Sequence, residues 1–572
     1  MGNDRSIRCF LCRCHGEISR VIDLDEVARA LKSHPGVRSL DVRNSLCLEE
    51  DMDVLASRVE DPDATGLVLG ACSLYARGDR IRTALEEKGI SPDTVEVVDI
   101  REGCSWIHHG QPREATTKAI DLLRMGVALQ RHRENPDEVM VDPVREVFVL
   151  GAGPAGISAA ASLVRLGVRV HLLDRAKSPG GLLNLVKRIA PEDVTSDEYL
   201  SQKQQTIFAS NGGVSHYPGA KLISAHGSAG DFTISFSSGK TEHAIRVGAV
   251  IVATGAKILM PDGLYRHGNL EGVLTGIELE RRFKAGQLEG NRVVFIQCVG
   301  VRDRKRPYCS AICCIVSLKQ ACQVLDVDPQ AEVFVLHRDI MCPGSVLEKY
   351  YRDAMARGVR FLRYEQDRPP VVLGDENVDS VEVYDALTSE MRRIKADLVV
   401  LSTPLAPHDD AGRIAELFGL NRDEHGFYEV RTLMHPLETK REGVFVCGSA
   451  RWPVLGRSAV LQGEAAAMKA YELISRGTLA ASRLSTYRER KFSLARVDHE
   501  ACTGCGNCVA VCPYDACSLE KKEGALKSTV NLIRCSGCGS CVSVCPNGSI
   551  QLPGHSAMAI GEMLKAVCEQ GS

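Results

Sequence analysis

The chain has 572 residues, enough for about three or four domains, with a formal net charge of −3 and 25% charged residues. This balance gives no reason to expect nucleic acid or an anionic membrane as a partner, and no apolar run approaches the roughly 20 residues that cross a bilayer. Because the N-terminus lacks a signal-peptide core, the 23 cysteines indicate metal centres in a reducing compartment, and we expect a cytoplasmic protein.

Residues 6–130 alternate between predicted strands and predicted helices, which indicates a parallel sheet with helices on its faces. We expect strands at Ile7–Phe10, Val37–Val42, Gly66–Leu69 and Val95–Ile100, and helices at Leu24–Leu31, Met52–Val59, Arg80–Lys88 and Glu114–Gln130. The carboxyl ends of parallel strands lie along one edge of the sheet, which is where ligands bind. We therefore expect a binding site at this edge of the sheet.

Cysteines follow every one of these strands, so four separate loops bring thiols to the same edge. We predict a 4Fe–4S cluster held by Cys47, Cys72, Cys104 and one of Cys12 or Cys14. The alternative is a set of small core residues, because free cysteine packs well. Cys9 lies inside the first strand and is predicted to be a core residue. Residues 1–133 would form this N-terminal α/β iron–sulfur domain.

A polar segment at 134–143 leads into a strand and a glycine-rich turn that runs from Gly151 to Gly156. The first glycine makes the turn, the second admits a pyrophosphate, and the third lets helix and strand pack closely. The phosphate would lie at a helix N-terminus, where free N–H groups favour anions. A second strand, Val168–Leu173, ends in Asp174, whose carboxylate is placed to bind a ribose hydroxyl.

Two later segments favour FAD over NAD at this site. Val250–Ala256 looks like the strand and turn that return to the dinucleotide in flavoprotein disulfide reductases, and Gly443–Ala450 resembles their second flavin motif. The helix beginning near Ser458 would point its N-terminus at the isoalloxazine, and Cys447 would be a core thiol beside it. The predicted FAD-binding residues are Gly151, Gly153, Pro154, Ala155, Gly156, Asp174, Arg175, Gly180, Gly181, Leu182, Ala253, Thr254, Gly255, Gly448, Ser449 and Ser458.

A second Rossmann unit binds NAD(P)H in thioredoxin-reductase-like folds, and its strands are expected here at Arg292–Gln297 and Glu332–Leu336. The glycine fingerprint between them is missing, and a cysteine-rich loop replaces it. We predict a 4Fe–4S site on Cys298, Cys309, Cys313 and Cys314; the alternative is a redox disulfide involving Cys313 or Cys314. The FAD domain would span residues 144–492, with the second subdomain at about 288–402.

The C-terminal region carries two matched cysteine runs, each ending in Cys-Pro. In this spacing three thiolates surround one cluster and the cysteine before proline ligates the other. We therefore predict one 4Fe–4S cluster on Cys502, Cys505, Cys508 and Cys545, and a second on Cys535, Cys538, Cys541 and Cys512. Paired zinc sites are the alternative. This ferredoxin-like domain would span residues 493–554, followed by a tail at 555–572, and bring the total to about four clusters.

Together these motifs resemble the HdrA family, the flavin and iron–sulfur subunits of heterodisulfide reductases. The resemblance rests on Cys12–Gly16, Ala71–Ser73, Arg101–Trp106, the flavin motif, Gln297–Cys314 and the ferredoxin-like region. It implies an α/β multidomain oxidoreductase with an N-terminal parallel α/β cluster domain, a thioredoxin-reductase-like two-Rossmann FAD domain and a C-terminal 2×4Fe–4S ferredoxin domain. FAD would be the reactive centre, so no side chain is predicted to be catalytic.

The resemblance also implies flavin-based electron bifurcation or confurcation between a two-electron donor, a low-potential ferredoxin-type acceptor and a disulfide- or quinone-type acceptor. The implied partners are heterodisulfide reductase B- and C-like subunits, a hydrogenase or dehydrogenase with a small iron–sulfur linker protein, and ferredoxin, in a dimeric hetero-oligomeric complex.

HdrA of methanogens carries a ferredoxin domain inserted in the flavin domain, whereas the stretch from Gly181 to Val250 here has no cysteine. This chain would be a short form, and that difference favours one alternative, a non-bifurcating electron relay. Another alternative is an NAD(P)H-dependent flavin oxidoreductase, against which the missing second glycine fingerprint argues.

Overall fold

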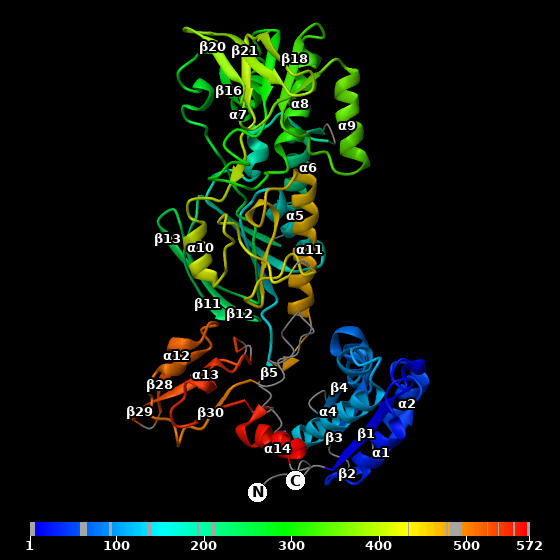
Figure 1. The fold of residues 1–572 in the computed structure, drawn as a ribbon. Helices are drawn as coiled ribbons and strands as arrows, with labels where there is room; N and C mark the ends of the chain where they lie inside the picture. Colours follow the sequence, from blue (N-terminus) through cyan, green and yellow to red (C-terminus); the bar gives the residue numbers. More distant parts are fainter. Residues whose placement is uncertain are drawn as a thin grey trace. The chain divides into compact units, whose positions relative to one another are not determined.

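The computed structural model describes residues 6–57, 66–90, 94–133, 140–191, 194–208, 213–432, 434–475, 477, 479–480, 494–522, 524–532, 534–535, 537–552 and 555–568. Its internal contacts divide the chain into two units, one made of Met1–Val139 with Glu489–Ser572 and the other of Met140–Arg488. The joining segments expected at 134–143 and around 492 lie mostly outside the described residues. Figure 1 gives the elements of each unit.

The N-terminal part of the first unit is a parallel four-stranded sheet in the order β2-β1-β3-β4, as the alternating pattern predicts. Short helical turns at Cys14–Gly16, Leu74–Gly78 and Arg101–Trp106 follow three of the strands. The strands are β1 Ile7–Cys12, β2 Val37–Arg43, β3 Gly66–Ala71 and β4 Val95–Asp99, and the helices are α1 Leu24–Lys32, α2 Glu49–Ser57, α3 Asp79–Glu87 and α4 Pro112–His132.

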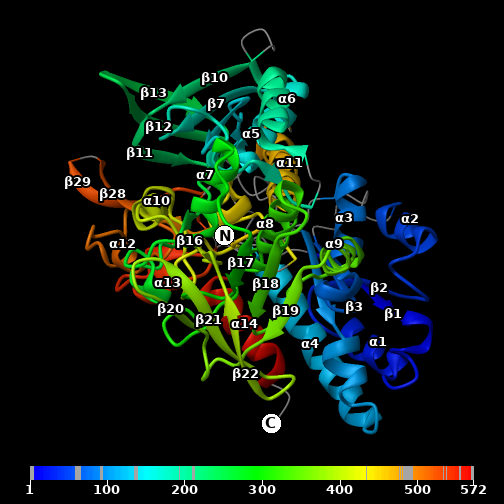
Figure 2. The same ribbon diagram turned by 90° about the horizontal axis from the view of Figure 1, so that it is seen from above.

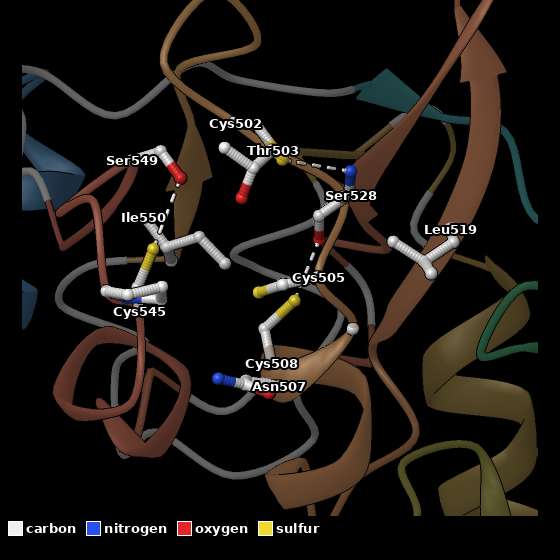
Figure 3. A pocket seen from close by; sticks show the side chains of 13 residues that line it. Cys502, Thr503, Cys505, Asn507, Cys508, Leu519, Ser528, Cys545, Ser549 and Ile550 are labelled. Carbon is white, nitrogen blue, oxygen red and sulfur yellow. Dashed lines mark hydrogen bonds between the residues drawn. The ribbon is translucent and has the colours of Figure 1, made fainter.

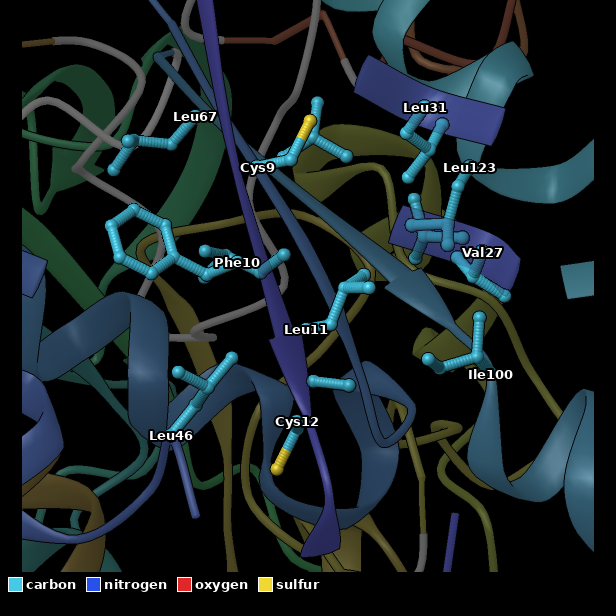
Figure 4. Close-up of a cluster of buried hydrophobic side chains, with 14 of the residues drawn as sticks. Cys9, Phe10, Leu11, Cys12, Val27, Leu31, Leu46, Leu67, Ile100 and Leu123 are labelled. Atoms are coloured by element: carbon cyan, nitrogen blue, oxygen red, sulfur yellow. The ribbon is translucent and has the colours of Figure 1, made fainter. Parts of the chain in front are cut away.

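The side chains of β1 alternate between two apolar faces, because successive residues of a strand point to opposite sides. Figure 4 shows Cys9 and Leu11 on the side of α1 and α4, with Phe10 on the other side. Cys9 is 1% exposed, which confirms it as a core residue. The strand therefore delivers Cys12, its last residue, to the carboxyl edge of the sheet.

The C-terminal part of the first unit repeats one small pattern twice. Each repeat has a short helix that begins after a left-handed glycine, Gly506 (φ 81°) or Gly539 (φ 79°). The elements are α12 Asn507–Val511, α13 Ser540–Ser543, and the antiparallel pairs β28 Cys517–Lys522 with β29 Ala525–Val530 and β27 Arg496–Val497 with β30 Ile550–Gln551.

The segment expected as a C-terminal tail is largely helical. Residues Ala557–Cys568 form α14, which packs against α4 within the first unit. Alanine, methionine, leucine and lysine favour helix and dominate this stretch. The first and last parts of the chain are thus joined by packed helices.

The second unit begins with a parallel sheet in the order β10-β7-β6-β14-β25. Helices α5 and α11 pack on each other and on this sheet, whereas an antiparallel sheet and α10 cover its other face. The elements are β6 Glu146–Leu150, α5 Pro154–Arg165, β7 Arg169–Asp174, α6 Ser196–Phe208, β10 Val214–Pro218, β14 Ala249–Val252, α10 Ala411–Phe418, β25 Val444–Val446 and α11 Gly456–Ser475, with the antiparallel strands β11 Lys221–Ser228, β12 Asp231–Ser238 and β13 Thr241–Val247.

A second parallel sheet, in the order β16-β23-β17-β18-β19, confirms the two-Rossmann prediction. Helices pack on one face and a three-stranded antiparallel sheet on the other (Figure 2). The elements are β16 Val273–Thr275, α7 Gly276–Ala285, β17 Arg292–Ile296, α8 Cys313–Val327, β18 Glu332–His337, α9 Ser345–Ala356, β19 Arg360–Arg363, β20 Val371–Gly374, β21 Val378–Asp385, β22 Glu390–Lys395 and β23 Leu398–Leu401.

Short two-stranded pairs complete the second unit: β5 Met140–Val141 with β26 Leu479–Ala480, β8 Arg188–Ile189 with β9 Val194–Thr195, and β15 Lys257–Ile258 with β24 Leu405–Ala406. Across the residues that the structure describes, none of the helices combines the length and the apolarity that a membrane span needs.

Candidate functional site

A cavity of about 590 Å³ lies in the second unit and is lined by both of its Rossmann-like parts. The first part contributes the turn after β6, the end of β7, the turn after β14 and the start of α11. The second part contributes α7, α8 and the segment after β23. The predicted FAD-binding residues that line the cavity are Gly151, Gly153, Pro154, Ala155, Asp174, Arg175, Gly181, Leu182, Ala253, Thr254, Gly255, Gly448 and Ser449.

The glycine-rich turn is built for close backbone approach. Gly151 has φ 105°, and a Cβ there would lie 2.4 Å from the carbonyl oxygen of Ala253. A Cβ on Gly156 would lie 1.8 Å from the carbonyl oxygen of Gly151, so Gly156 packs the helix on the strand and does not line the cavity. The Asp174 carboxylate accepts hydrogen bonds from the N–H groups of Ala152 and Ala176, which fixes its side chain at the cavity wall.

Two other predicted residues support the cavity from outside its lining. The N–H of Gly180 donates to the carbonyl oxygen of Ala152 at 2.7 Å and braces the glycine-rich turn. Ser458 lies in the first turn of α11, and its neighbours Gly456 and Ala459 line the cavity in its place. The start of α11 thus meets the cavity as predicted, through different residues.

A buried ion pair in the same cavity was not predicted from the sequence. Lys319 Nζ on α8 lies 2.6 Å from Glu280 Oε1 on α7, and the two side chains are 4% and 1% exposed. Lys319 also donates to the carbonyl oxygen of Arg188 at 3.0 Å. Glu280 accepts from Gln320 Nε2 at 2.8 Å and from the N–H of Lys187 at 3.0 Å. The available sequence signal was a lysine in the middle of α8, a helix rich in apolar residues.

The four cysteines of the second Rossmann-like part come together. Cys298, Cys309, Cys313 and Cys314 line one small pocket, together with Arg302 and Asp339. Cys313 and Cys314 are the first residues of α8, where the helix dipole favours an anionic group. Burial raises the pKa of Cys314 to about 11, so a metal must take the place of its proton for it to act as a ligand.

Cys313 belongs to two cavities at once. It lines the cysteine pocket and also the 590 Å³ cavity. Burial raises the pKa of its thiol, and its sulfur donates to the carbonyl oxygen of Thr403 at 3.5 Å. The two sites therefore share one side chain as a wall. Cys313 and Cys314 are free thiols in the structure.

The C-terminal cysteines separate into the two sets that the motif predicts. Cys502, Cys505, Cys508 and Cys545 line one pocket, which we name pocket A; Cys512, Cys535, Cys538 and Cys541 line another, pocket B. Figure 3 shows the sulfur atoms of pocket A around a common space. Polar groups face several of these sulfur atoms: Ser549 Oγ lies 3.2 Å from Cys545 Sγ, and the N–H of Ser528 donates to Cys502 Sγ at 3.4 Å.

The N-terminal thiols gather at the carboxyl edge of the first sheet. Cys12 lies close enough to Cys14 and Cys47 to be affected by their charge, and Cys72 lies within similar reach of Cys14. Burial raises the pKa of Cys12 to about 11. Arg101 Nη1 donates to Cys14 Sγ at 3.1 Å, which directs a positive charge at this group of thiols.

Cys104 does not join this group. Its fully buried sulfur donates to the carbonyl oxygen of Ala115 in α4 at 3.1 Å, and the charged groups that act on it are Lys118 and Asp99. The π-helical turn Arg101–Trp106 carries Cys104 with its side chain directed inward, toward α4. The structure thus groups Cys12 and Cys14 with Cys47 and Cys72, which differs from the predicted set that included Cys104.

The sequence model of the pyridine nucleotide-disulphide oxidoreductases matches residues 145–470. The chain belongs to this family. The model of the 4Fe-4S dicluster domain matches residues 494–546, which holds both matched cysteine runs. As a member of this family the chain is an oxidoreductase, and the two matches support FAD and 4Fe–4S groups as its cofactors.

Among curated proteins, this oxidoreductase is similar to HdrA proteins over most of its length, which confirms the resemblance. One of two such iron–sulfur subunits of the CoB–CoM heterodisulfide reductase of Methanopyrus kandleri is 29% identical, over 91% of this chain and 92% of the relative. The HdrA protein of the H₂/formate:CoB–CoM heterodisulfide,ferredoxin reductase of Methanococcus maripaludis is 28% identical, over 96% of each chain.

Among solved structures, the thioredoxin reductase of T. acidophilum covers 57% of this chain and 97% of its own, with 20% identity and a TM-score of 0.41.

The chain's own residues fit the cofactors that these matches support. The turn at Gly151 has no room for a side chain, the Asp174 carboxylate is fixed at the wall, and the cavity of about 590 Å³ is continuous between the two parts. Each cysteine pocket brings at least four thiols, the donor set of an iron–sulfur cluster. The oxidoreductase chemistry is therefore expected at the cavity shared by the two Rossmann-like parts. Iron–sulfur groups held by the cysteine pockets would carry the electrons.

Proposed function

We propose that this chain is the FAD- and iron–sulfur-containing electron-transfer subunit of a heterodisulfide reductase-like complex, and that its flavin splits or combines electron pairs. The observation that carries the proposal is the side chain of Cys313, which lines both the flavin cavity and a four-cysteine pocket. A two-electron site and a one-electron site separated by a single side chain are suited to exchanging single electrons.

FAD supplies the two-electron chemistry when bound, and the iron–sulfur clusters supply the one-electron steps. Gly151, Gly153 and Gly181 line the part of the cavity suited to the pyrophosphate, and Asp174 is suited to the ribose. Lys319 places an ammonium group at the cavity wall, where it would donate a hydrogen bond to the bound cofactor. Glu280 holds that ammonium group in place.

We propose four clusters for this chain. Pockets A and B would each hold one, and a third would be bound by Cys298, Cys309, Cys313 and Cys314. For the fourth we propose Cys12, Cys14, Cys47 and Cys72, because Cys104 is held in the core.

The partners follow by analogy with the relatives. The names of relatives mention heterodisulfide, ferredoxin, and H₂ or formate. For this chain we propose heterodisulfide reductase B- and C-like subunits, a hydrogenase or dehydrogenase with an iron–sulfur linker protein, and ferredoxin, assembled in the cytoplasm. A non-bifurcating relay is the second candidate, because the region between Gly181 and Val250, where methanogen HdrA carries extra clusters, has no cysteine here.

The test is an anaerobic redox titration of the reconstituted protein, followed by flavin absorbance and EPR. Reduction of the flavin in one two-electron step means that its two one-electron potentials are crossed, so one of the two electrons leaves as a strong reductant. Reduction in two well-separated one-electron steps would refute bifurcation and leave the relay. Addition of NADH or NADPH alone should not reduce the flavin; rapid bleaching would instead support the nicotinamide-dependent alternative.

A further inference from the structure

Pocket B contains a fifth cysteine. Besides the four motif thiols, Cys517 lines this pocket, at the start of β28. Its side chain is buried and belongs to the same apolar cluster as Cys535 and Cys541. The spacing that predicts ferredoxin ligands does not include Cys517, so it stands outside both matched runs.

The internal repeat of this region supplies a matched comparison. Cys517 follows Cys512-Pro by the same number of residues as Ile550 follows Cys545-Pro, and each residue begins a strand. Ile550 is buried and lines pocket A, where Figure 3 shows it beside Cys545. At this position of the repeat, pocket B therefore has a thiol where pocket A has a hydrocarbon side chain.

Cys517 and Cys541 both line pocket B and belong to the same apolar cluster, so their side chains are neighbours. A thiol that lines the pocket lies within reach of a metal group bound there. Free cysteine also serves as a small core residue, but the equivalent Ile550 of pocket A shows that the fold needs no thiol at this position. The fifth thiol of pocket B therefore favours a role toward the metal group.

We infer that pocket B is a five-thiol site in which Cys517 donates a hydrogen bond to the Cys541 sulfur and replaces it as a ligand when Cys541 is lost. In the exchange, Cys517 releases its proton to solvent and binds iron as a thiolate, with no change of oxidation state. The inference rests on a 4Fe–4S group in pocket B, as the proposed function does, but not on the direction of electron flow.

The test compares equivalent ligands in the two pockets of the full-length holoprotein. Cys508 in pocket A and Cys541 in pocket B are the third cysteines of their runs. Cys541→Ala is expected to retain the iron and sulfide content of the wild type, whereas Cys508→Ala and the double variant Cys541→Ala/Cys517→Ala are each expected to lose about four iron atoms per chain. Adding Ile550→Cys to Cys508→Ala should restore that iron, because it gives pocket A a fifth thiol.

Loss of the same iron from Cys541→Ala as from Cys508→Ala would overturn the inference. If Cys541→Ala does not fold, Cys517→Ala alone decides the question, since all four motif ligands remain. This variant should keep its iron while the midpoint potential and EPR spectrum of one cluster change, because hydrogen bonds to sulfur tune cluster potentials. An unchanged potential and spectrum would mean that Cys517 is a core residue. Absence of iron from pocket B in the wild type would instead refute the proposed cofactor content.

Discussion

Removal of both partners of the Lys319–Glu280 ion pair should destabilise the second unit much less than the sum of the two single removals. At 2.6 Å and an effective dielectric constant of about 20, the attraction is about 6 kcal/mol, and desolvation of two charges offsets much of it. Glu280→Gln keeps a hydrogen-bond acceptor for Gln320 but leaves the Lys319 ammonium buried without its counter-charge. We expect each single variant, Glu280→Gln or Lys319→Met, to lose about 3–5 kcal/mol in the free energy of unfolding.

The double variant Glu280→Gln/Lys319→Met removes both charges, so it should lose less than the sum of the two single losses, with a coupling energy of about 3 kcal/mol. The wild type, the two single variants and the double variant form a double-mutant cycle. Urea denaturation, followed by flavin fluorescence and circular dichroism, measures the free energy of unfolding of all four proteins. The exposed pair Lys349–Asp353 on α9 is the matched control, and its coupling should be below about 0.5 kcal/mol. Additivity of the Lys319 and Glu280 losses to within about 0.5 kcal/mol would refute the reasoning.

Three further predictions concern other parts of the chain. Gly463→Ala should release FAD although Gly463 does not line the cavity, because its Cβ would lie 2.1 Å from the carbonyl oxygen of Ala155 and force α11 away from α5; bound flavin per chain measures this. Cys47→Ser should lower the iron content by about one cluster, whereas Cys104→Ser should leave it unchanged. Burial lowers the pKa of His408 to about 4, so His408→Leu should flatten the loss of stability of the apoprotein between pH 6.5 and 4.

The direction in which stability changes with pH follows from the lower proton affinity of His408 in the folded protein. Between pH 6.5 and 4 the unfolded chain is protonated at this position and the folded chain is not, so stability is fully present above pH 6.5 and falls toward pH 4. Partial exposure of the ring reduces the effect to about 1–2 kcal/mol. An unchanged pH slope in His408→Leu would contradict this assignment.

For the prediction on Gly463, which packs α11 on α5, Gly412→Ala in α10 is the control. This variant should retain FAD, because its Cβ would meet only the flexible end of Arg422.

The sequence predicted best those features that depend on local spacing. The four thiols of pocket A and the turn at Gly151 lie where their motifs require, because ligand spacing and a tight turn are properties of a few neighbouring residues. Cys104 lies apart from the other predicted thiols because the direction of its side chain depends on the helical turn Arg101–Trp106 and on the packing of α4. Lys319 and Glu280 lie on different helices, and no periodic pattern links them.

The packing of α14 on α4 has a consequence for how the protein is made. These two helices belong to one unit, yet the whole of the other unit lies between them in the sequence. The ribosome therefore synthesises the flavin-binding part before α14. The N-terminal sheet and α4 cannot pack against α14 until residues Ala557–Cys568 have been synthesised. Any process that inserts iron into the first unit acts on a scaffold whose two halves are synthesised before and after the whole of the second unit.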